Sequence, residues 1–558
     1  MPRSKQSSSR FLGETCTSAA AIGETRIGRR RQRLKTPGFR CAARLSVAAE
    51  VGSRKRAAWV ARGLGEWAGI GPKSGISAHL GRADVLQRRL PTGDGAAWPG
   101  IRARLEPGRR QVRVIARKFA DAICFGCRSE GVQRWLRTLA PAALLCLLAG
   151  PAAAEEAALD TGDTAWILVS TALVLFMTIP GLALFYGGLV RTKNVLSVLM
   201  QCMTLTAAIT LVWYAFGYSL AFDAGGAFVG GLGKSFLRGI TGDTLWGTIP
   251  EILFCAFQMT FAIITPALMI GAFVERIKFS GMLLFSVLWL VVVYLPVCHM
   301  VWGGGYLAGL GVMDFAGGIV VHVTAGVGAL VACIVIGPRR GYGVTAIFPH
   351  NMTMTVTGTA MLWVGWFGFN GGSALGSNGG AAMAITATHL SASTAALTWM
   401  GIEWIKHGKP SALGLATGAI AGLAAVTPAS GYIGPTGGLL IGLVSGACCF
   451  LASTSLKQKL GYDDSLDVFG VHGVGGFIGT VMAGFLAAET FGGNVADLNA
   501  GSQTALQFAA ALGVAGFTAL ATWVLLRLVD ASVGLRVSEQ EESDGLDVVS
   551  HDESGYRY

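Results

Sequence analysis

From residue 165 to residue 529, the chain alternates between long apolar stretches and shorter polar ones. Each apolar stretch is close to the twenty or so residues that an α-helix needs to cross a bilayer, and their internal glycines and prolines are tolerable within a helical bundle. The predicted spans are 165–189, 194–222, 248–273, 280–302, 316–337, 351–373, 380–405, 411–429, 434–455, 468–490 and 503–529. The pattern therefore predicts an all-α integral membrane protein with eleven transmembrane helices.

The basic residues of the short loops predict how these helices are oriented, because lysine and arginine gather on the cytoplasmic side. Basic residues follow every odd-numbered span, at Arg191, Lys193, Arg276, Lys278, Arg339, Arg340, Lys406, Lys409, Lys457, Lys459 and Arg536. Lys234 and Arg238, in the longer loop after the second span, lie on the opposite side with Asp223 and Asp243. We therefore expect an N-out/C-in topology.

Two histidines stand at corresponding places in the fifth and tenth spans. His322 and His472 are each followed, three and four residues later, by small residues on the same helix face, which would let another helix approach. Entering from opposite sides, at about Asp314 and Asp467, the two spans reach these histidines after about 12 Å and 7.5 Å of helix. Because five is odd, two five-span halves would be oppositely oriented. The sequence thus predicts an inverted 5+5 repeat plus one extra helix, with a shared site near the midplane.

Composition agrees with a membrane protein and changes the meaning of the net charge. Hydrophobic residues make up 52% of the 558 residues and charged residues only 14%, against about 25% charged in typical soluble domains. The net charge of +12 could suggest nucleic acid as a partner. However, residues 1–130 hold 27 basic and 9 acidic residues, whereas the rest of the chain has 17 and 23. We therefore expect no nucleic-acid partner for the membrane part.

The first 154 residues resemble upstream and targeting sequence rather than a folded domain. Residues 1–130 show no sustained periodicity, and we interpret them as a basic disordered or spurious extension. Residues 131–154 combine a basic start, an apolar run of about twelve residues and a final Ala-Ala-Ala, which is the pattern of a signal peptide. A cleaved signal peptide agrees with an external N-terminus.

An aromatic series lies on the outer side of the predicted histidine pair. Trp302 is at the outer end of the fourth span, Phe369 and Ser373 share a face of the sixth, and Phe257 and Phe261 share a face of the third. Aromatic faces attract small cations, a hydroxyl accepts a hydrogen bond, and two imidazoles offer both donors and acceptors. These groups fit a cation that can lose a proton on its way, and ammonium is the obvious candidate.

Other interpretations of these residues stay open from the pattern alone. The histidines could be a structural pair, and the aromatics could be ordinary core packing. Two imidazoles near the midplane could also ligate heme in a membrane oxidoreductase. A second histidine pair and basic partners for the heme propionates are not evident in the sequence, so we expect no cofactor.

At these residues the sequence resembles the Amt branch of the ammonium transporter (Amt/Mep/Rh) family, over residues 163–556. The specific motifs are Thr178-Ile-Pro-Gly-Leu-Ala-Leu-Phe-Tyr-Gly-Gly188, Asp314-Phe-Ala-Gly-Gly318, Gly365-Trp-Phe-Gly-Phe-Asn370 and Asp467-Val-Phe-Gly-Val-His-Gly473. The resemblance implies an eleven-helix protomer, at residues 163–530, in a homotrimer with one pore per protomer. It also implies a transporter of ammonium or ammonia, with methylammonium as a further substrate, and not an enzyme.

The resemblance also implies a role for each site residue. Trp302, Phe261 and Ser373 would form the outer binding site for ammonium, Phe261 and Phe369 the gate, and His322 and His472 the pore. Asp314, Trp366 and Phe257 would support them, although capping of a helix is an equally good local interpretation of Asp314.

The C-terminal residues resemble the regulatory region of the same family. Residues 531–558 contain Val533-Gly-Leu-Arg536 and Gly545-Leu-Asp-Val-Val-Ser-His-Asp-Glu553, and the resemblance implies a cytoplasmic tail that couples protomers and binds a PII-type signalling protein. A solvated acidic tail is the alternative. We expect a multi-pass protein of the plasma (cell inner) membrane that imports ammonium, and an ammonium sensor that signals through its tail is the rival function.

Overall fold

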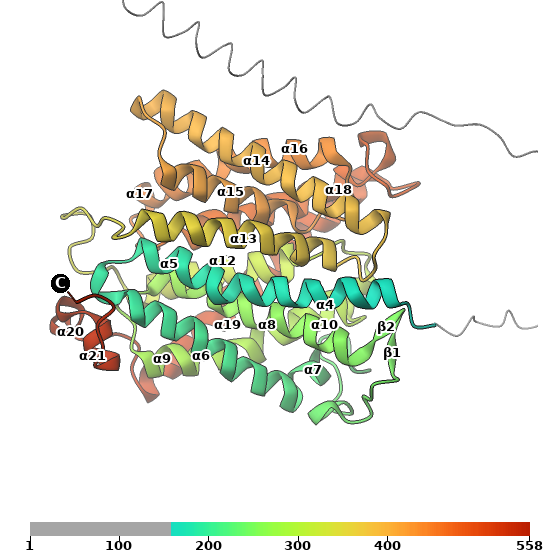
Figure 1. Ribbon diagram of the computed structural model, residues 1–558, viewed down its shortest axis with the longest axis horizontal. Coiled ribbons are helices and arrows are strands. Elements are labelled where there is room, and N and C mark those ends of the chain that lie inside the picture. The colour runs from blue at the N-terminus through green and yellow to red at the C-terminus, as the bar shows by residue number, and fades with distance from the viewer. Residues whose placement is uncertain (1–157, 558) are drawn as a thin grey trace, which may run out of the picture. The chain divides into compact units, whose positions relative to one another are not determined.

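A computed structural model of the chain describes residues 158–557. The predictions of an extension over residues 1–130 and of a signal peptide over residues 131–154 lie outside the described residues. Within the described part, long helices run alongside one another, and residues far apart in the sequence lie in neighbouring helices (Figure 1).

The described residues form helices over each of the eleven segments that the apolar pattern predicts. In chain order they are α4 (Thr161–Phe176) with α5 (Ala183–Leu189), α6 (Val195–Val212) with α7 (Tyr218–Phe222), α8 (Glu251–Phe273), α9 (Phe279–Trp289) with α10 (Leu295–Trp302), α12 (Thr324–Ile336), α13 (Met352–Gly372), α14 (Gly379–His407), α15 (Ala412–Val426), α16 (Pro435–Leu451) with α17 (Lys457–Leu460), α18 (Val474–Leu486) and α19 (Ala500–Ser532).

Eight helical spans of the described part are long and apolar enough to cross a membrane, fewer than the eleven predicted from the sequence. Of the other three segments, α15 is apolar but has only 15 residues. The helices α13 and α14 are long, at 21 and 29 residues, but carry many glycine, serine and threonine residues, which lower their hydropathy. The chain is therefore an all-helical membrane protein, and these three helices differ in character from the other eight spans.

Several predicted spans are interrupted by π-helical turns, which the apolar pattern does not reveal. The first span contains Pro180, which lacks a backbone N–H, and its chain leaves helical geometry at Ile179. The turns are η1 (Met177–Leu182), η3 (Trp213–Gly217), η5 (Leu290–Tyr294), η6 (Gly318–Val323), η7 (Ala452–Leu456) and η8 (Phe469–Gly473). Isolated π-turns inside α-helices are frequently found at functional sites, and here η6 and η8 each carry one of the two pore histidines predicted from the sequence.

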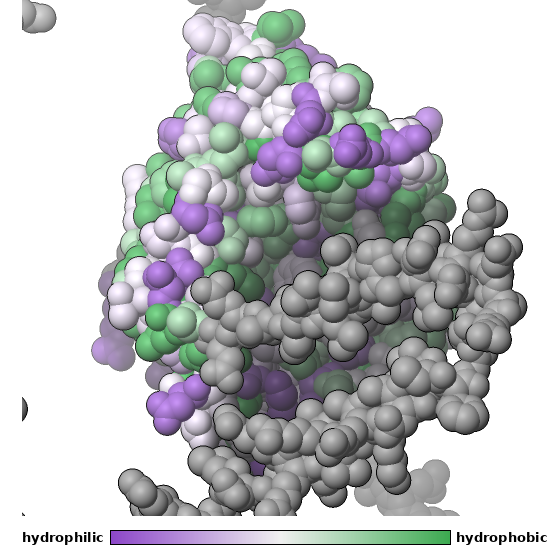
Figure 2. Space-filling view, turned by 90° about the vertical axis from the view of Figure 1, so that its right-hand side faces the viewer, coloured by the Kyte–Doolittle hydropathy of each residue, from purple (hydrophilic) through white to green (hydrophobic). Residues whose placement is uncertain are grey.

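A small hairpin departs from the all-α prediction. The strands β1 (Leu245–Trp246) and β2 (Ile249–Pro250) pair antiparallel in the loop before α8. Figure 2 looks onto the end of the bundle that carries this hairpin and shows hydrophilic and hydrophobic residues mixed on that face. The hairpin is too short to alter the fold class, but it places Trp246 against Phe254 of α8, with ring centroids 4.2 Å apart.

The centre of the bundle is held by close contact between η6–α12 and η8–α18. A Cβ atom on Gly326 would lie 2.2 Å from the backbone nitrogen of Gly473, and one on Gly476 would lie 2.7 Å from the Cβ of His322. Each glycine is four residues after a histidine, and each touches the segment around the other histidine. The small residues therefore allow the backbones of the two helices to come into direct contact, as the sequence predicts.

The C-terminal tail folds back onto the end of the bundle. Its two short helices, α20 (Glu539–Asp544) and α21 (Leu546–His551), lie beside the ends of α5, α6 and α9 (Figure 1). The amide of Ser197 donates to the Asp547 carboxylate at 2.8 Å, and the Leu546 amide donates to Asn194 at 2.8 Å. The tail is therefore bound to the start of α6 rather than solvated along its length.

Candidate functional site

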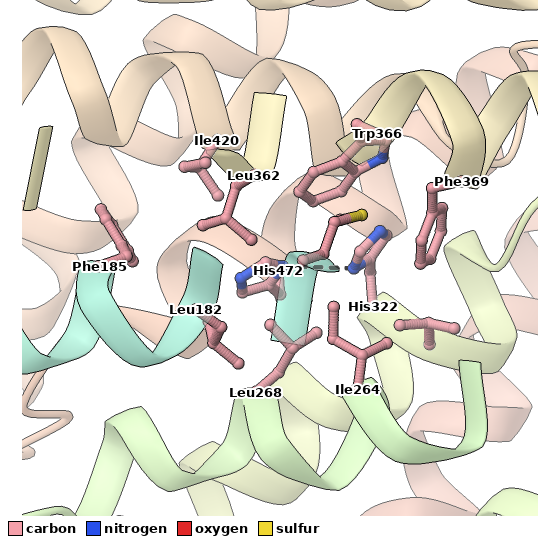
Figure 3. A pocket seen from close by; sticks show the side chains of 12 residues that line it. Leu182, Phe185, Ile264, Leu268, His322, Leu362, Trp366, Phe369, Ile420 and His472 are labelled. Carbon is pink, nitrogen blue, oxygen red and sulfur yellow. Dashed lines mark hydrogen bonds between the residues drawn. The ribbon is translucent and has the colours of Figure 1, made fainter. Parts of the chain in front are cut away.

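The two histidines predicted from the sequence meet inside the bundle. The Nδ1 atoms of His322 and His472 are 3.3 Å apart, and their ring centroids are separated by 5.2 Å with the planes tilted by 23°. Figure 3 shows the two rings with the dashed line between them, surrounded by apolar side chains. Both residues are buried, at 1% and 3% exposure.

The hydrogen bond between the rings fixes what each imidazole offers to its surroundings. One ring donates its Nδ1 proton to the Nδ1 of the other, so one outer Nε2 is an acceptor and the other is a donor. The Nε2 of His322 is buried and has no hydrogen-bond partner among the described residues. The pair therefore presents unused hydrogen-bonding capacity to whatever small polar molecule reaches it.

The histidines line a narrow, largely apolar cavity. Its volume is about 10 Å³, which is close to the space that one water molecule requires. The other lining residues are Met177, Leu182, Phe185, Ile264, Leu268, Val321, Leu362, Trp366, Phe369 and Ile420, most of which are labelled in Figure 3. A hydrated ion does not fit such a space, whereas a single small uncharged molecule does.

Two phenylalanine rings lie next to this cavity. Phe261 of α8 and Phe369 of α13 pack with ring centroids 4.3 Å apart and planes tilted by 39°, and Phe369 lies 6.0 Å from the ring of His322. Phe257, one turn before Phe261, supports it with an edge contact at 5.0 Å. Trp366 lies flat against His322 at 5.5 Å and donates from its indole nitrogen to Thr427. Phe261, Phe369 and His322 thus follow one another in ring-to-ring contact.

On the other side of the phenylalanine rings is a wider cavity of about 250 Å³. It is lined by Phe222, Trp246, Phe254, Gln258, Val301, Trp302, Phe315, Ser373 and Leu375. Trp302 makes an edge contact with Phe261 at 5.8 Å. The Ser373 hydroxyl donates to the carbonyl of Phe369 at 2.8 Å, so its oxygen lone pairs stay free to accept. This cavity combines aromatic surface with a hydroxyl acceptor.

Asp314 acts within the chain rather than as a free carboxylate in the cavity. Its two oxygens accept hydrogen bonds from the backbone amides of Gly317, Gly318, Ile319 and Val320, at 2.6 to 3.0 Å. Its own carbonyl accepts the indole N–H of Trp302 at 2.8 Å. The capping interpretation therefore describes its contacts, and through them Asp314 fixes both the start of η6 and the orientation of Trp302.

Sequence reasoning missed Asp464, the counterpart of Asp314. Asp464 precedes His472 by eight residues, as Asp314 precedes His322, and its carboxylate accepts the amide of Phe469 at the start of η8. Burial raises the pKa of Asp464 to about 6. The matched spacing was the available signal, but the prediction placed the start of that span at Asp467.

Gln258, which lines the outer cavity, was also missed, because a glutamine within a span carries no motif of its own.

The polar groups of the described part do not form a metal centre, since no group of three or more His, Cys, Asp or Glu residues there could hold an ion. The cysteines of that part, Cys202, Cys255, Cys298, Cys333, Cys448 and Cys449, are free thiols.

Comparison with known proteins identifies the family. Residues 165–556 match the model of the Ammonium Transporter Family. The chain is 46% identical over 420 residues to an ammonium transporter of Aquifex aeolicus, covering 74% of this chain and 97% of the relative. The crystal structure of Saccharomyces cerevisiae Mep2 is similar with a TM-score of 0.64 and 37% identity, covering 69% of this chain and 89% of Mep2.

A solved structure described as a sensor Amt protein is also similar, with a TM-score of 0.65 and 27% identity, covering 70% of this chain and 98% of that one. The match to the family model spans nearly all of the described helical bundle, and both His322 and His472 lie within it. The chain therefore belongs to the Ammonium Transporter Family, a family of membrane transporters rather than enzymes.

Proposed function

We propose that the chain binds ammonium in the outer cavity, removes a proton near Phe261 and Phe369, and conducts ammonia past His322 and His472. The observation that carries this proposal is the buried histidine pair, with Nδ1 atoms 3.3 Å apart, next to two phenylalanine rings that pack against each other. Trp302, Ser373 and Phe261 form the binding site, with a cation attracted to the ring faces and hydrogen-bonded to the hydroxyl.

The dimensions of the two cavities support loss of the proton between them. The outer cavity of about 250 Å³ can hold a cation with water, whereas the inner one of about 10 Å³ holds one small molecule. An ion that entered the inner cavity would lose its hydration without a ring of carboxylates or carbonyls to replace it. Neutral ammonia needs only a donor and an acceptor, and the imidazole pair supplies both.

The reciprocal contacts of the two histidine segments support an eleven-span protomer with an inverted 5+5 repeat. Gly326 and Gly476 exchange equivalent contacts, and Asp314 and Asp464 cap the two segments at equal distances from the histidines. Related halves of opposite orientation place a shared site near the midplane. The positively charged loops then put the N-terminus outside and the tail in the cytoplasm, in a plasma (cell inner) membrane.

The face formed by α13 and α14 supports a homotrimer. His389 of α14 is exposed on this face, where its Nδ1 accepts from the indole nitrogen of Trp363 at 3.2 Å. Exposed threonines lie on the same two helices, and both helices have lower hydropathy than the eight apolar spans. A histidine facing lipid is costly, so a second copy of the chain is the better neighbour for this face.

Adding bulk to this face is expected to break the assembly. Val364, 51% exposed on α13, is replaced by tryptophan, and Leu520, 65% exposed on α19, receives the same change as a matched control. Size-exclusion chromatography with light scattering in detergent should show Val364→Trp shifted from trimer to smaller species and Leu520→Trp still trimeric. Equal behaviour of the two variants would contradict a subunit contact at α13.

The bound tail supports a regulatory role for residues 531–558. Glu542 is buried and accepts from the Arg340 amide at 2.7 Å and from the Arg536 side chain at 2.9 Å, so tail position is coupled to the loop after α12. A PII-type signalling protein at the cytoplasmic face would bind to the tail in this arrangement or alter it. The same coupling keeps an ammonium sensor as the second candidate function, since a similar solved structure is described as a sensor.

Reconstitution into liposomes, with electrical current and internal pH recorded together after an ammonium jump, tests the proposal. Ammonia passing alone should raise internal pH without current, and ammonia passing with its proton should give an inward current. Either result supports transport when it exceeds the response of protein-free liposomes and when a potassium jump gives no current. A correctly folded protein that gives no response above protein-free liposomes would overturn the proposal in favour of a sensor.

A further inference from the structure

His299 of α10 joins the end of α7 to the loop that follows it. The side chain is buried, at 2% exposure. Its Nδ1 atom lies 2.9 Å from the carbonyl oxygen of Ala221, in α7, and its Nε2 atom lies 2.9 Å from the carbonyl oxygen of Gly226, in the loop. One imidazole ring of α10 therefore contacts both the end of a neighbouring helix and the loop after it.

The two partners of His299 determine which form of the ring fits this place. A backbone carbonyl can only accept a hydrogen bond, so both ring nitrogens face acceptors. A neutral imidazole has one N–H donor and one lone pair, and the lone pair would then meet a carbonyl oxygen at hydrogen-bond distance. The doubly protonated ring has two N–H donors and satisfies both carbonyls. The contacts of His299 therefore match the charged imidazolium form.

His350 provides a contrast within the same chain. Its Nδ1 atom also lies 2.9 Å from a backbone carbonyl, that of Val190, but its Nε2 atom lies 3.1 Å from the hydroxyl of Tyr556. A hydroxyl can donate as well as accept, so a neutral His350 satisfies both of these partners. Two partners that can only accept therefore distinguish His299 from His350.

The position of Ala221 near a helix end also favours a positive charge on His299. The helical run Thr192–Phe222 is continuous, and Ala221 is the residue before its last one. Carbonyl groups at the C-terminal end of a helix lack partners within the helix and attract cations. Burial opposes a charged ring, so the two carbonyl oxygens supply the interactions that keep the second proton in place.

The carboxylates on the segments that pack against α10 are bound by backbone amides. The helix α10 packs against α7, η5, η6 and the short helix α11 (Tyr306–Gly309). Asp223, at the end of α7, accepts from the amides of Ala224 and Gly233, and Asp314, before η6, accepts from four amides. The loop after α7 also carries Lys234, which is paired with Glu251. The remaining titratable groups of these segments are Tyr218, Tyr294, Cys298, Tyr306 and His322.

We propose that His299 is a pH-sensitive switch, whose doubly protonated ring binds α7 and the loop after it to α10 and whose deprotonation releases one of the two carbonyls. At higher pH the second proton passes to solvent, one donor remains for two acceptors, and the ring lone pair repels the other oxygen. Because the folded contact favours the charged ring, the contact is present at low pH and is lost as the pH rises. This switch goes beyond the proposed function.

The neighbours of His299 show which part of the molecule the switch affects. A Cβ atom on Gly303 would lie 2.1 Å from the carbonyl oxygen of Ala221, so the ends of α10 and α7 are in close contact. Phe222, next to Ala221, and Trp302, one turn after His299, both line the outer cavity. Release of the contact would therefore loosen one wall of that cavity.

The test measures hydrogen exchange of residues 219–233 by mass spectrometry, in the full chain in detergent, at pH 6 and at pH 9. Two variants remove the charge and keep one donor each. His299→Gln places an amide near the position of Nε2, and His299→Asn places one near the position of Nδ1. His350→Gln is the matched control, because His350 also contacts a backbone carbonyl but lies beside Tyr556 of the tail. Rates are corrected for the intrinsic effect of pH on exchange.

In the parent, corrected exchange of this segment is expected to be about tenfold slower at pH 6 than at pH 9, as the loss of a hydrogen bond to a charged group implies. His350→Gln should keep that difference. His299→Gln and His299→Asn should exchange faster than the parent at pH 6 and show no difference between the two pH values. A parental pH dependence in either variant overturns the inference. If neither variant folds, equal exchange of the parent at both pH values overturns it instead.

Nitrogen-15 NMR of histidine-labelled protein reads the protonation state directly. The signals that His299→Asn loses at pH 6 should belong to two protonated nitrogens, and a lost signal of an unprotonated nitrogen would contradict the switch. Both measurements proceed without transport. A parent protein that conducts no ammonium therefore contradicts the proposed function alone, while exchange and NMR still decide on His299.

Discussion

Replacing His322 or His472 by alanine is expected to reduce ammonium flux by about a hundredfold, a loss that corresponds to roughly 3 kcal/mol. Each imidazole is one half of a buried hydrogen-bonded pair, and removing either leaves the other Nδ1 without its partner at 3.3 Å. An orphaned buried polar group costs about 1–3 kcal/mol, and the passing ammonia loses a donor or an acceptor as well. Initial rates of internal pH change in proteoliposomes measure the effect.

The same substitution could also alter what passes through the pore. Alanine enlarges the narrow cavity, because in the parent the imidazole ring of His322 fills the space beside Trp366 and Phe369. Water that enters the enlarged cavity would lower the cost of admitting an ion. We therefore expect any residual flux of the variants to show weaker discrimination against potassium, which current after a potassium jump would reveal.

His407→Ala is the control for this prediction. His407 ends α14 and is exposed, far along the chain from both His322 and His472, so its removal should leave rate and selectivity at parental values. Parental rate combined with parental selectivity over potassium in His322→Ala and His472→Ala would contradict the pore role of the pair.

The positions of the helices follow from the sequence because burial in lipid requires long apolar runs. Each of the eleven predicted segments coincides with a helix in the described part, and the bounds differ by only a few residues for most of them. The weak points are α13 and α14, whose threonines and glycines lower their hydropathy. Hydropathy alone therefore does not rank them with the other eight spans.

The site could be predicted as a set of residues but not as a geometry. Spacing placed His322 and His472 near the midplane, yet the contact between their Nδ1 atoms depends on the π-turns η6 and η8, which have no apolar signature. Asp464 escaped prediction for a related reason. Its role depends on the hydrogen bond that caps the start of η8, and that contact exists only once the chain has folded.

A buried ion-pair network at the tail end of the bundle gives the second large prediction. Arg339 contacts Glu275 at 3.0 Å and Asp463 at 2.8 Å, and all three side chains are buried. Burial alone would raise the pKa of Glu275, but the guanidinium groups of Arg339 and Arg191 outweigh it and hold that pKa below its usual range. At Asp463, burial would also raise the pKa, but the hydrogen bonds from Arg339 outweigh this effect and lower the pKa.

Arg339→Met is therefore expected to destabilise the protein by about 3–5 kcal/mol at neutral pH, because it leaves two buried carboxylates without their main partner. Thermal unfolding in detergent measures the loss as a lower melting temperature. Arg340→Met is the matched control, since the neighbouring Arg340 side chain is exposed and its contacts with the tail are worth little. Equal melting temperatures for the two variants would contradict a stabilising role for the network.

The stability of the parent and the stability of Arg339→Met should depend on pH with opposite signs. In the parent, the depressed pKa values of Glu275 and Asp463 mean that the folded state binds fewer protons than the unfolded one. Their stabilisation is complete above the unfolded values of about 4 and is lost as the pH falls below them. In Arg339→Met, burial without Arg339 favours the protonated carboxyls, so the folded state binds more protons. Lowering the pH from 7 to 5 should then narrow the difference in melting temperature between variant and parent. A difference that widens over this range would show that the loss of stability does not come from unpaired Glu275 and Asp463.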